Sequence, residues 1–217
     1  NYAIYMNKDY GNVKGYTFSL TKRYDPVSRT SAFVDYTYQV TEGNSVNSGS
    51  FYYNALSGEQ EEKRIVPLAW DQRHIFNTNF SVGDPRNWNL GIISKLSSGW
   101  PYTPNIPDAN YVPQPNSGRK PWQWRVDMRI HKNIKIRNLN YILYMKVYNL
   151  LDRRNERYVF DDTGRAGYTY VFQSTQETQG FKNHYGEAGV HKWSEYQVRP
   201  HYYTAPRSIN IGFSVDF

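Results

Sequence analysis

Charged side chains alternate along one short stretch of the sequence. Residues 124–131 read W-R-V-D-M-R-I-H, so that every second residue is charged or an imidazole. The group comprises Arg125, Asp127, Arg129 and His131, and Lys146 follows in the next alternating stretch. A period of two places such groups on one face of a β-strand, with the intervening apolar residues on the other. We expect this face to be wet, with Asp127 pairing with Arg125, Arg129 or Lys146.

A second group of candidate residues lies in the proline-rich stretch 99–121. Its aromatic residues are Trp100, Tyr102 and Tyr111. Flat aromatic faces stack on sugars and planar chelates, and their polar edges stay wet. These three residues are therefore candidate ligand contacts, and the alternative is ordinary packing within a loop.

The patterns of catalytic and metal sites are missing from the sequence. The five histidines, at 74, 131, 184, 191 and 201, do not form an H-E-x-x-H motif, and no G-x-S-x-G stretch is present. With no cysteine there is no disulfide and no cysteine-based zinc or iron–sulfur site. Asp161 and Asp162 predict a turn rather than a calcium site. We expect no enzymatic activity, no metal and no cofactor.

Composition narrows the class of protein further. The net charge is +7, but the basic residues are scattered rather than clustered, which argues against nucleic-acid binding. Hydrophobic residues make up 39% and aromatic residues 17%, a balance that suits thin apolar faces bounded by water. No apolar run approaches the ~18 residues of a transmembrane helix, and transmembrane strands remain possible because they alternate.

Alternation predicts an all-β chain of about eight strands and no helix. The strands are expected at residues 14–24, 30–41, 73–83, 88–98, 122–136, 139–151 and 208–217, with a strand end at 1–6 and a hairpin of 157–160 and 168–172 around a turn at 161–164. In the last strand, Ile209, Ile211, Phe213, Val215 and Phe217 alternate with polar residues and glycine. Three folds fit such strands: a soluble sandwich, a sheet with a half-buried edge, and a membrane barrel.

Connection lengths favour the barrel. Short turns at 25–29, 84–87 and 137–138 alternate with long segments at 42–71, 99–121 and 152–207, as short periplasmic turns and long extracellular loops do in outer-membrane barrels. Strands of about 9–11 residues, tilted by ~40°, span ~23–28 Å, which matches an apolar band of ~25 Å. The charged row would then line a polar lumen. Aromatic residues near strand ends would form interfacial girdles, with core packing as the alternative for some: Trp88, Trp122, Trp124, Tyr141 and Phe217.

Several motifs resemble one family. The stretches P-L-A-W-D-Q-R-H-I-F-N (67–77), V-Y-N-L-L-D-R-R-N (147–155), D-T-G-R-A (162–166) and A-P-R-S-I-N-I-G-F-S-V-D-F (205–217) resemble the C-terminal part of TonB-dependent outer-membrane receptors, and D-Y-G-N-V-K-G-Y-T-F-S-L (9–20) resembles an earlier strand pair. The style is similar to that of the Bacteroidetes-like branch. Together these motifs extend over nearly the whole chain.

The resemblance implies an antiparallel transmembrane β-barrel of 22 strands with a plugged lumen, located in the bacterial outer membrane. Residues 1–217 would supply about the last eight strands, and the plug and the TonB-contacting segment would lie upstream. The implied function is active uptake of a bulky nutrient, such as a ferric siderophore, glycan or peptide. The implied partners are outer-membrane lipids, the TonB-type energising complex, the barrel-insertion machinery and, as a further candidate, a surface lipoprotein lid.

The chain end resembles the signal that the insertion machinery reads, carried by Phe213, Val215 and Phe217. The alternative function is a passive porin or a small structural barrel made from this chain alone. We expect residue 1 to be an interior position of a longer polypeptide; a mature N-terminus after signal removal is the other possibility. The residues that precede Asn1 would distinguish the two.

Overall fold

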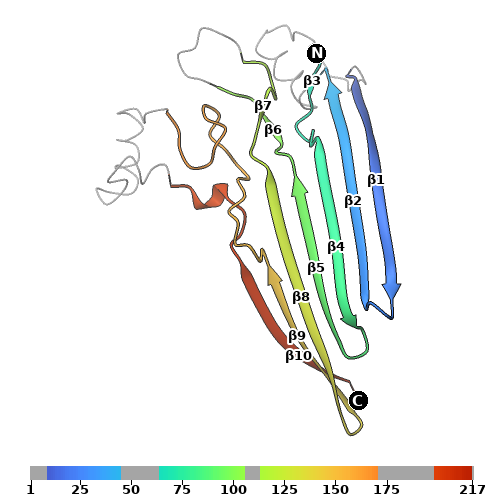
Figure 1. Ribbon diagram of the computed structural model, residues 1–217. Coiled ribbons are helices and arrows are strands. Elements are labelled where there is room, and N and C mark those ends of the chain that lie inside the picture. Colours follow the sequence, from blue (N-terminus) through green and yellow to red (C-terminus); the bar gives the residue numbers. More distant parts are fainter. Residues whose placement is uncertain (1–8, 45–63, 106–112, 171–197, 217) are drawn as a thin grey trace, which may run out of the picture.

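The computed structural model describes residues 9–44, 64–105, 113–170 and 198–216. Seven long strands form one sheet (Figure 1): β1 (Gly11–Asp25), β2 (Thr30–Gly43), β4 (His74–Asp84), β5 (Trp88–Ser97), β8 (Gln123–Ile136), β9 (Leu139–Tyr148) and β10 (Ser208–Asp216). Three two-residue strands accompany them: β3 (Val66–Pro67) pairs with β2, and β6 (Pro101–Tyr102) pairs with β7 (Gly118–Arg119). A single 3-10 turn, η1 (Pro200–Tyr202), precedes β10. Within these ranges, no helix is long and apolar enough to cross a membrane.

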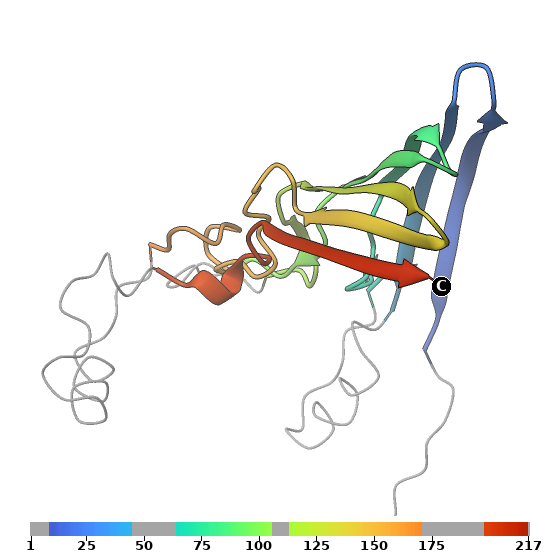
Figure 2. The ribbon, with the colours of Figure 1, turned by 90° about the horizontal axis from the view of Figure 1, so that it is seen from below.

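The strands follow one another in an antiparallel meander. Their order is β1-β2-β4-β5-β8-β9-β10, and β1 and β10 are the two edges of the open sheet. Figure 2, seen from below, shows that the sheet is bent rather than flat. The all-β, antiparallel prediction is confirmed, and the described strands do not close into a barrel.

Short and long connections lie at opposite ends of the sheet (Figure 1). The short ones, at 26–29, 85–87 and 137–138, occupy what we call the turn end. The Asp25 carboxylate accepts hydrogen bonds from the Val27 and Ser28 N–H groups, and Arg29 and Arg137 adopt left-handed φ values of 52°. Such turns reverse the chain within a few residues, as the sequence predicts. The long connections leave from the other end, the loop end.

Strand register separates the side chains into two faces. One cross-strand row runs Ala32–Phe80–Ile92–Met128–Val147–Ile209, from β2 to β10. A row on the opposite face runs Ser19–Asp35–Asn77–Lys95–Arg125, from β1 to β8. Paired residues project to the same side of a sheet. The sheet therefore has one mainly apolar face and one mainly polar face across its full width.

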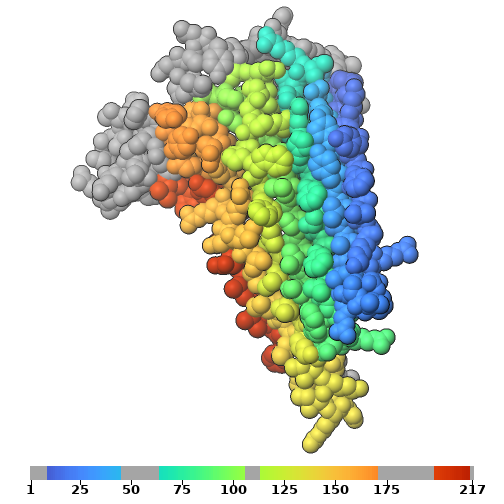
Figure 3. Space-filling model, viewed as in Figure 1, coloured from blue at the N-terminus to red at the C-terminus, as the bar shows by residue number. Residues whose placement is uncertain are grey.

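The apolar face has no partner among the described residues. Phe18, Ile211 and Phe213 keep exposed fractions of 62%, 78% and 72%. Only five hydrophobic side chains are buried in the described ranges: Val66, Val126, Val147, Val159 and Ala166. On the face that Figure 3 shows, the side chains of neighbouring strands lie open, with no second layer over the sheet. Within the described residues, the sheet is a single layer with no second sheet packed against it.

Several sequence-based boundaries differ from the structure. The expected strand at 157–160 is wrong: the Arg157 and Tyr158 N–H groups both donate to the Tyr202 carbonyl, so this segment folds against the turn before β10. The turn at 161–164 is confirmed, because Gly164 N donates to the Phe160 carbonyl. The strand expected at 139–151 stops at Tyr148. The next residue, Asn149, has a φ of 54°, which ends the extended conformation.

The small strands β3, β6 and β7 were not expected from the sequence. Each is two residues long, so none can produce an alternating pattern. The strand end expected at 1–6 lies outside the described residues, as do residues 171–172 and Phe217. The described part of the strand expected at 168–172, residues 168–170, is not a strand.

Candidate functional site

The five charged and imidazole residues that the sequence singles out lie together on the polar face. Arg129 of β8 faces Lys146 of β9, and His131 faces Tyr144. Arg125 and Asp127 lie on the same side of β8 because they are separated from Arg129 by even numbers of residues. The structure therefore brings all five onto one surface, which is exposed or half-buried.

One ion pair forms within this row. Arg125 Nε donates to Asp127 Oδ1 at 2.9 Å, and the same oxygen accepts a hydrogen bond from the Asn149 N–H at 2.8 Å. Of the three partners considered for Asp127, the structure selects Arg125. No carboxylate lies within ion-pair distance of Arg129 or Lys146 in the described ranges, and Lys146 Nζ lies 5.4 Å from the centroid of the Tyr144 ring. The row carries more positive than negative charge.

Two hollows indent this face. The strand hollow, of ≈ 600 Å³, lies over the middle of the sheet, and its wall includes Asn79, Asp127, Arg129 and Lys146. The loop-end hollow, of ≈ 420 Å³, lies where the long connections leave the strands. Its wall includes Lys95, Trp100, Gln123, Arg125, Asn155 and Thr204. Tyr148 lines both hollows, so they adjoin along β9.

Asparagine side chains build one wall of the loop-end hollow. The Asn155 amide accepts from the Trp124 N–H and donates to the Trp124 carbonyl, both at 2.9 Å, which extends the hydrogen-bonding pattern of β8 as a strand would. The Asn149 amide donates to the carbonyls of Arg153 and Ala205. The motif at 147–155 therefore fixes the conformation of the loop, because its two asparagine side chains form hydrogen bonds with the backbone.

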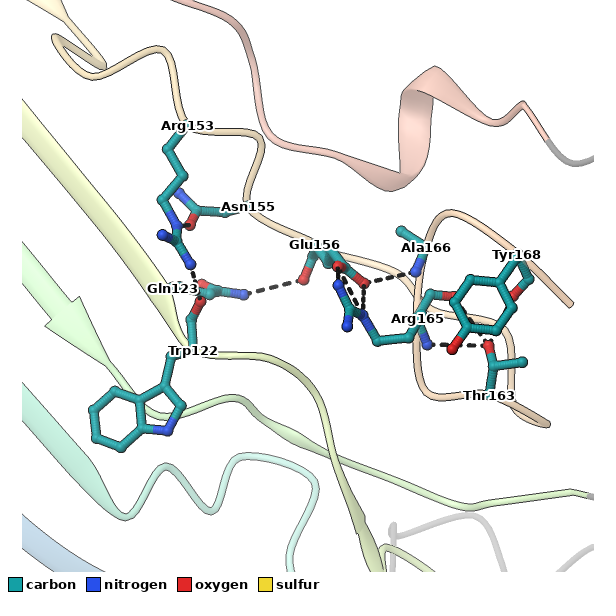
Figure 4. Close-up of polar contacts among 9 residues, drawn as sticks. All are labelled: Trp122, Gln123, Arg153, Asn155, Glu156, Thr163, Arg165, Ala166 and Tyr168. Atoms are coloured by element: carbon teal, nitrogen blue, oxygen red, sulfur yellow. Dashed lines mark hydrogen bonds and ion pairs between the residues drawn. The ribbon is translucent and has the colours of Figure 1, made fainter.

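Glu156 and Arg165 fix the loop that follows Asn155. The Arg165 guanidinium donates to both Glu156 oxygens, with Nη2 at 2.8 Å from Oε1, and the Ala166 N–H donates to Oε2 at 2.6 Å. Figure 4 shows the Glu156 side chain between the Arg165 guanidinium and the Ala166 nitrogen. The pKa of Arg165 is raised, chiefly by its hydrogen bonds to Glu156. The motif at 162–166 therefore has a structural role: Arg165 and Ala166 hold their loop against Glu156.

The three candidate loop aromatics have different positions. Trp100 lines the loop-end hollow and is 44% exposed. Tyr102 packs within the loops: a Cβ added at Gly164 would meet its hydroxyl at 2.3 Å, and burial together with the charges of Asp161 and Asp162 raises its pKa. Tyr111 lies outside the described residues. Only Trp100 is placed where a ligand in the hollow would reach it.

A buried carboxylate that the sequence did not single out fastens the loop end. Asp71 is 0% exposed and accepts hydrogen bonds from the Thr41 N–H at 2.9 Å, from Arg73 Nε at 3.3 Å and from the Arg119 guanidinium. Burial raises the pKa of Asp71, but these bonds and the Arg119 charge outweigh it, and the net pKa is lowered. Asp71 lies within the motif at 67–77, but its burial and partners could not be predicted from that motif, because Thr41 and Arg119 come from distant segments.

Four of the five aromatic residues expected at the strand ends, Trp88, Trp122, Trp124 and Tyr141, lie on the apolar face, and Phe217 lies outside the described residues. Trp122 stacks on His74 with ring centroids 5.6 Å apart, and the Trp124 indole donates to Ser94 Oγ at 2.9 Å. Phe213 and Val215 of the proposed insertion signal project from the same face of β10. Within the described ranges, no cluster of three or more histidine, aspartate or glutamate side chains could hold a metal ion.

Comparison with known proteins gives no assignment. No family model matches the chain, and no curated protein or solved structure matches it.

Proposed function

We propose that the chain forms part of an outer-membrane β-barrel that takes up a bulky nutrient in a TonB-dependent manner. In this proposal the apolar face contacts lipid and the polar face lines a wet lumen. The strands β1 and β10 pair with further strands of a larger barrel, of about 22 strands as the motif resemblance implies.

One observation carries the proposal: the exposed apolar face is continuous across seven strands, and the polar face lies directly behind it. A soluble sheet hides its apolar face against another layer, and exposed apolar patches larger than a few hundred Å² are rare on soluble monomers. In a hydrocarbon environment, an exposed apolar face of this kind is stable without a second layer of protein over it. Ile211 and Phe213, the most exposed large residues of β10, fit that environment.

The two ends of the sheet support the same orientation. Turns of two to four residues at one end and connections of tens of residues at the other are typical of outer-membrane barrels, with the turns in the periplasm. The loop-end hollow would then open toward the outside of the cell. A nutrient captured there could move along the positively charged row toward the strand hollow.

The position of the two faces can be tested with a fluorescent probe, since the chain has no cysteine. Ile211→Cys and Asn210→Cys are adjacent and differ only in face. Each variant of the full-length protein, labelled with a bimane fluorophore, is folded into vesicles that contain brominated lipids. We expect strong quenching at position 211 and weak quenching at 210, and the reverse with aqueous iodide. Equal quenching at both positions would refute the lipid-facing assignment.

Active uptake is tested separately in cells. Growth on a limiting nutrient that depends on this protein should stop when the inner-membrane energising complex is deleted or the proton gradient is collapsed. A passive porin or small structural barrel is the alternative. In that case, growth and solute entry continue without the energising complex.

A further inference from the structure

We propose that the loop-end hollow binds a ligand that combines a carboxylate with a flat apolar surface. The proposal rests on the uptake function and names the chemical class of the nutrient. Acidic sugars and ferric chelates of aromatic carboxylates share this chemistry, and the experiment below separates them.

Two cations form the first half of the argument. Lys95 of β5 and Arg125 of β8 are direct register partners, and both line the hollow. Like charges directly opposite one another in a sheet are destabilising. Arg125 uses Nε for Asp127, while Lys95 has no carboxylate within ion-pair distance in the part of the chain that the structure describes. A carboxylate placed between the two side chains would relieve this repulsion.

The side-chain amides of the wall already have hydrogen-bond partners within the chain. Gln72 Nε2 donates to the Ser98 carbonyl at 2.9 Å, and Gln123 Nε2 donates to the Glu156 carbonyl at 3.4 Å. The Asn149 and Asn155 amides are bonded to backbone groups. These groups fix the shape of the hollow, and its charged donors, Lys95 and Arg125, remain for a ligand.

The aromatic surface forms the second half. Trp100 lines the hollow and is 44% exposed, so part of its ring system remains available for stacking. The Arg125 guanidinium lies 5.9 Å from the centroid of the Tyr148 ring, which also lines the hollow and holds the cation in place. A volume of ≈ 420 Å³ suits a small ligand or the end of a longer one. Positive charge and a flat ring in the lining of one hollow favour an anionic ligand with a flat face over a neutral or cationic one.

The experiment measures binding to the full-length protein in detergent by titration calorimetry. The probes are trigalacturonate, ferric salicylate and, as a neutral control, maltotriose. We expect one of the two carboxylate probes to bind at least ten-fold more tightly than maltotriose, with an affinity that falls as salt rises. Binding of trigalacturonate indicates an acidic glycan, and binding of ferric salicylate indicates a chelate. If neither binds more tightly than maltotriose, the proposal is overturned.

Three variants test the position of the site. Lys95→Gln and Trp100→Ala should each weaken the binding of the preferred probe at least ten-fold. Lys135→Gln removes the same charge from the same face at the turn end of β8 and should leave binding unchanged. Equal losses of affinity in Lys95→Gln and Lys135→Gln would overturn the proposal, because the probe would then be attracted by the net charge of the protein and not by this site.

Failure of this site and failure of the uptake function are distinguishable. A protein that shows the expected lipid quenching and energised uptake, but treats acidic and neutral probes alike, refutes only the ligand class. A protein that binds the carboxylate probe and shows no lipid-facing positions refutes the membrane function and leaves the binding site.

Discussion

The buried carboxylate of Asp71 is stabilised by the hydrogen bonds and charges of its partners. Asp71 lies between β3 and β4 at the loop end, fully buried, where its carboxylate joins the Thr41 backbone of β2 to Arg119 of β7. A buried charge is stabilising only when such partners replace water. Arg73 and Arg119 remain partly exposed, at 37% and 32%, so solvent screens part of their attraction.

Asp71→Asn should lower the free energy of unfolding by about 1–3 kcal/mol, because the amide loses the charge-assisted bonds and leaves Arg119 without a counter-charge. Thr41→Val is the matched control: Thr41 is also fully buried, and its hydroxyl has no hydrogen-bond partner in the described part of the chain. That change should be neutral or stabilising. Urea unfolding of the full-length protein in lipid vesicles measures both. Equal losses in the two variants would contradict a specific role of the Asp71 charge.

The lowered pKa of Asp71 predicts a pH dependence with a definite sign. The ordinary value is 3.8, and the folded value lies below it. The stabilisation is therefore complete above 3.8 and is lost as the pH falls through the lower folded value. We expect the stability difference between wild type and Asp71→Asn to be constant near neutral pH and to shrink below pH 3.8. A difference that grows in acid would contradict the assignment.

At the residue scale, the charged row was predictable from the sequence, but the residues that hold the neighbouring loops in place were not. Arg125, Asp127 and Arg129 alternate within one strand, so their common face follows from the period of two. The pairing of Asp127 with Arg125 depends on side-chain geometry and was left open. The Asn155 side chain accepts a hydrogen bond from the Trp124 N–H, 31 residues earlier in the chain. No local sequence pattern predicts a contact between residues so far apart.

At the scale of the strand, glycines show where two backbones approach closely. A Cβ at Gly15 of β1 would lie 2.4 Å from the Tyr38 carbonyl oxygen of β2. A Cβ at Gly91 of β5 would meet nothing closer than 3.9 Å. Both glycines lie on the polar face within long strands, so they form a matched pair that differs in available space.

Gly15→Ala should cost about 1–3 kcal/mol, because the strands β1 and β2 must move apart to admit the methyl group. Gly91→Ala should stay within about 1 kcal/mol of the wild type. Urea unfolding in vesicles measures the stability, and hydrogen exchange of the β1 amides shows whether the loss is local. If the two substitutions have equal effects, the close approach of β1 to β2 is wrong.

At this scale the long strands were predictable and the short ones were not. Each long strand has at least nine residues, enough for alternation to be read, and the three turns carry Asp, Pro or Asn beside the reversal. Between 149 and 207 the described chain is organised by contacts such as Glu156 with Arg165, and no period describes them. The prediction of a hairpin strand at 157–160 was wrong for this reason.

At the scale of the molecule, the sheet has an apolar side and a polar side, which the proposed function assigns to two solvents, lipid and water. Its apolar rows continue from strand to strand through the register, and the charged row and both hollows lie on the opposite side. The sequence predicted this separation because alternation in each strand is in phase with its neighbours. Closure of the sheet is a different matter, since it depends on how the edges β1 and β10 are paired.

Phe213→Arg and Ser214→Arg place the same charge at neighbouring positions of β10 on opposite faces. If Phe213 lies near the middle of a bilayer, Arg there should cost about 2–4 kcal/mol, whereas Arg at Ser214 reaches water in the lumen and should cost under about 1 kcal/mol. Equilibrium folding of the full-length protein into vesicles measures both. Equal costs in vesicles would contradict the two-solvent arrangement. The contrast should also weaken in detergent micelles, where a charged side chain reaches water more easily than in a bilayer, and a contrast of the same size there would mean that protein packing, not hydrocarbon, penalises the charge at Phe213.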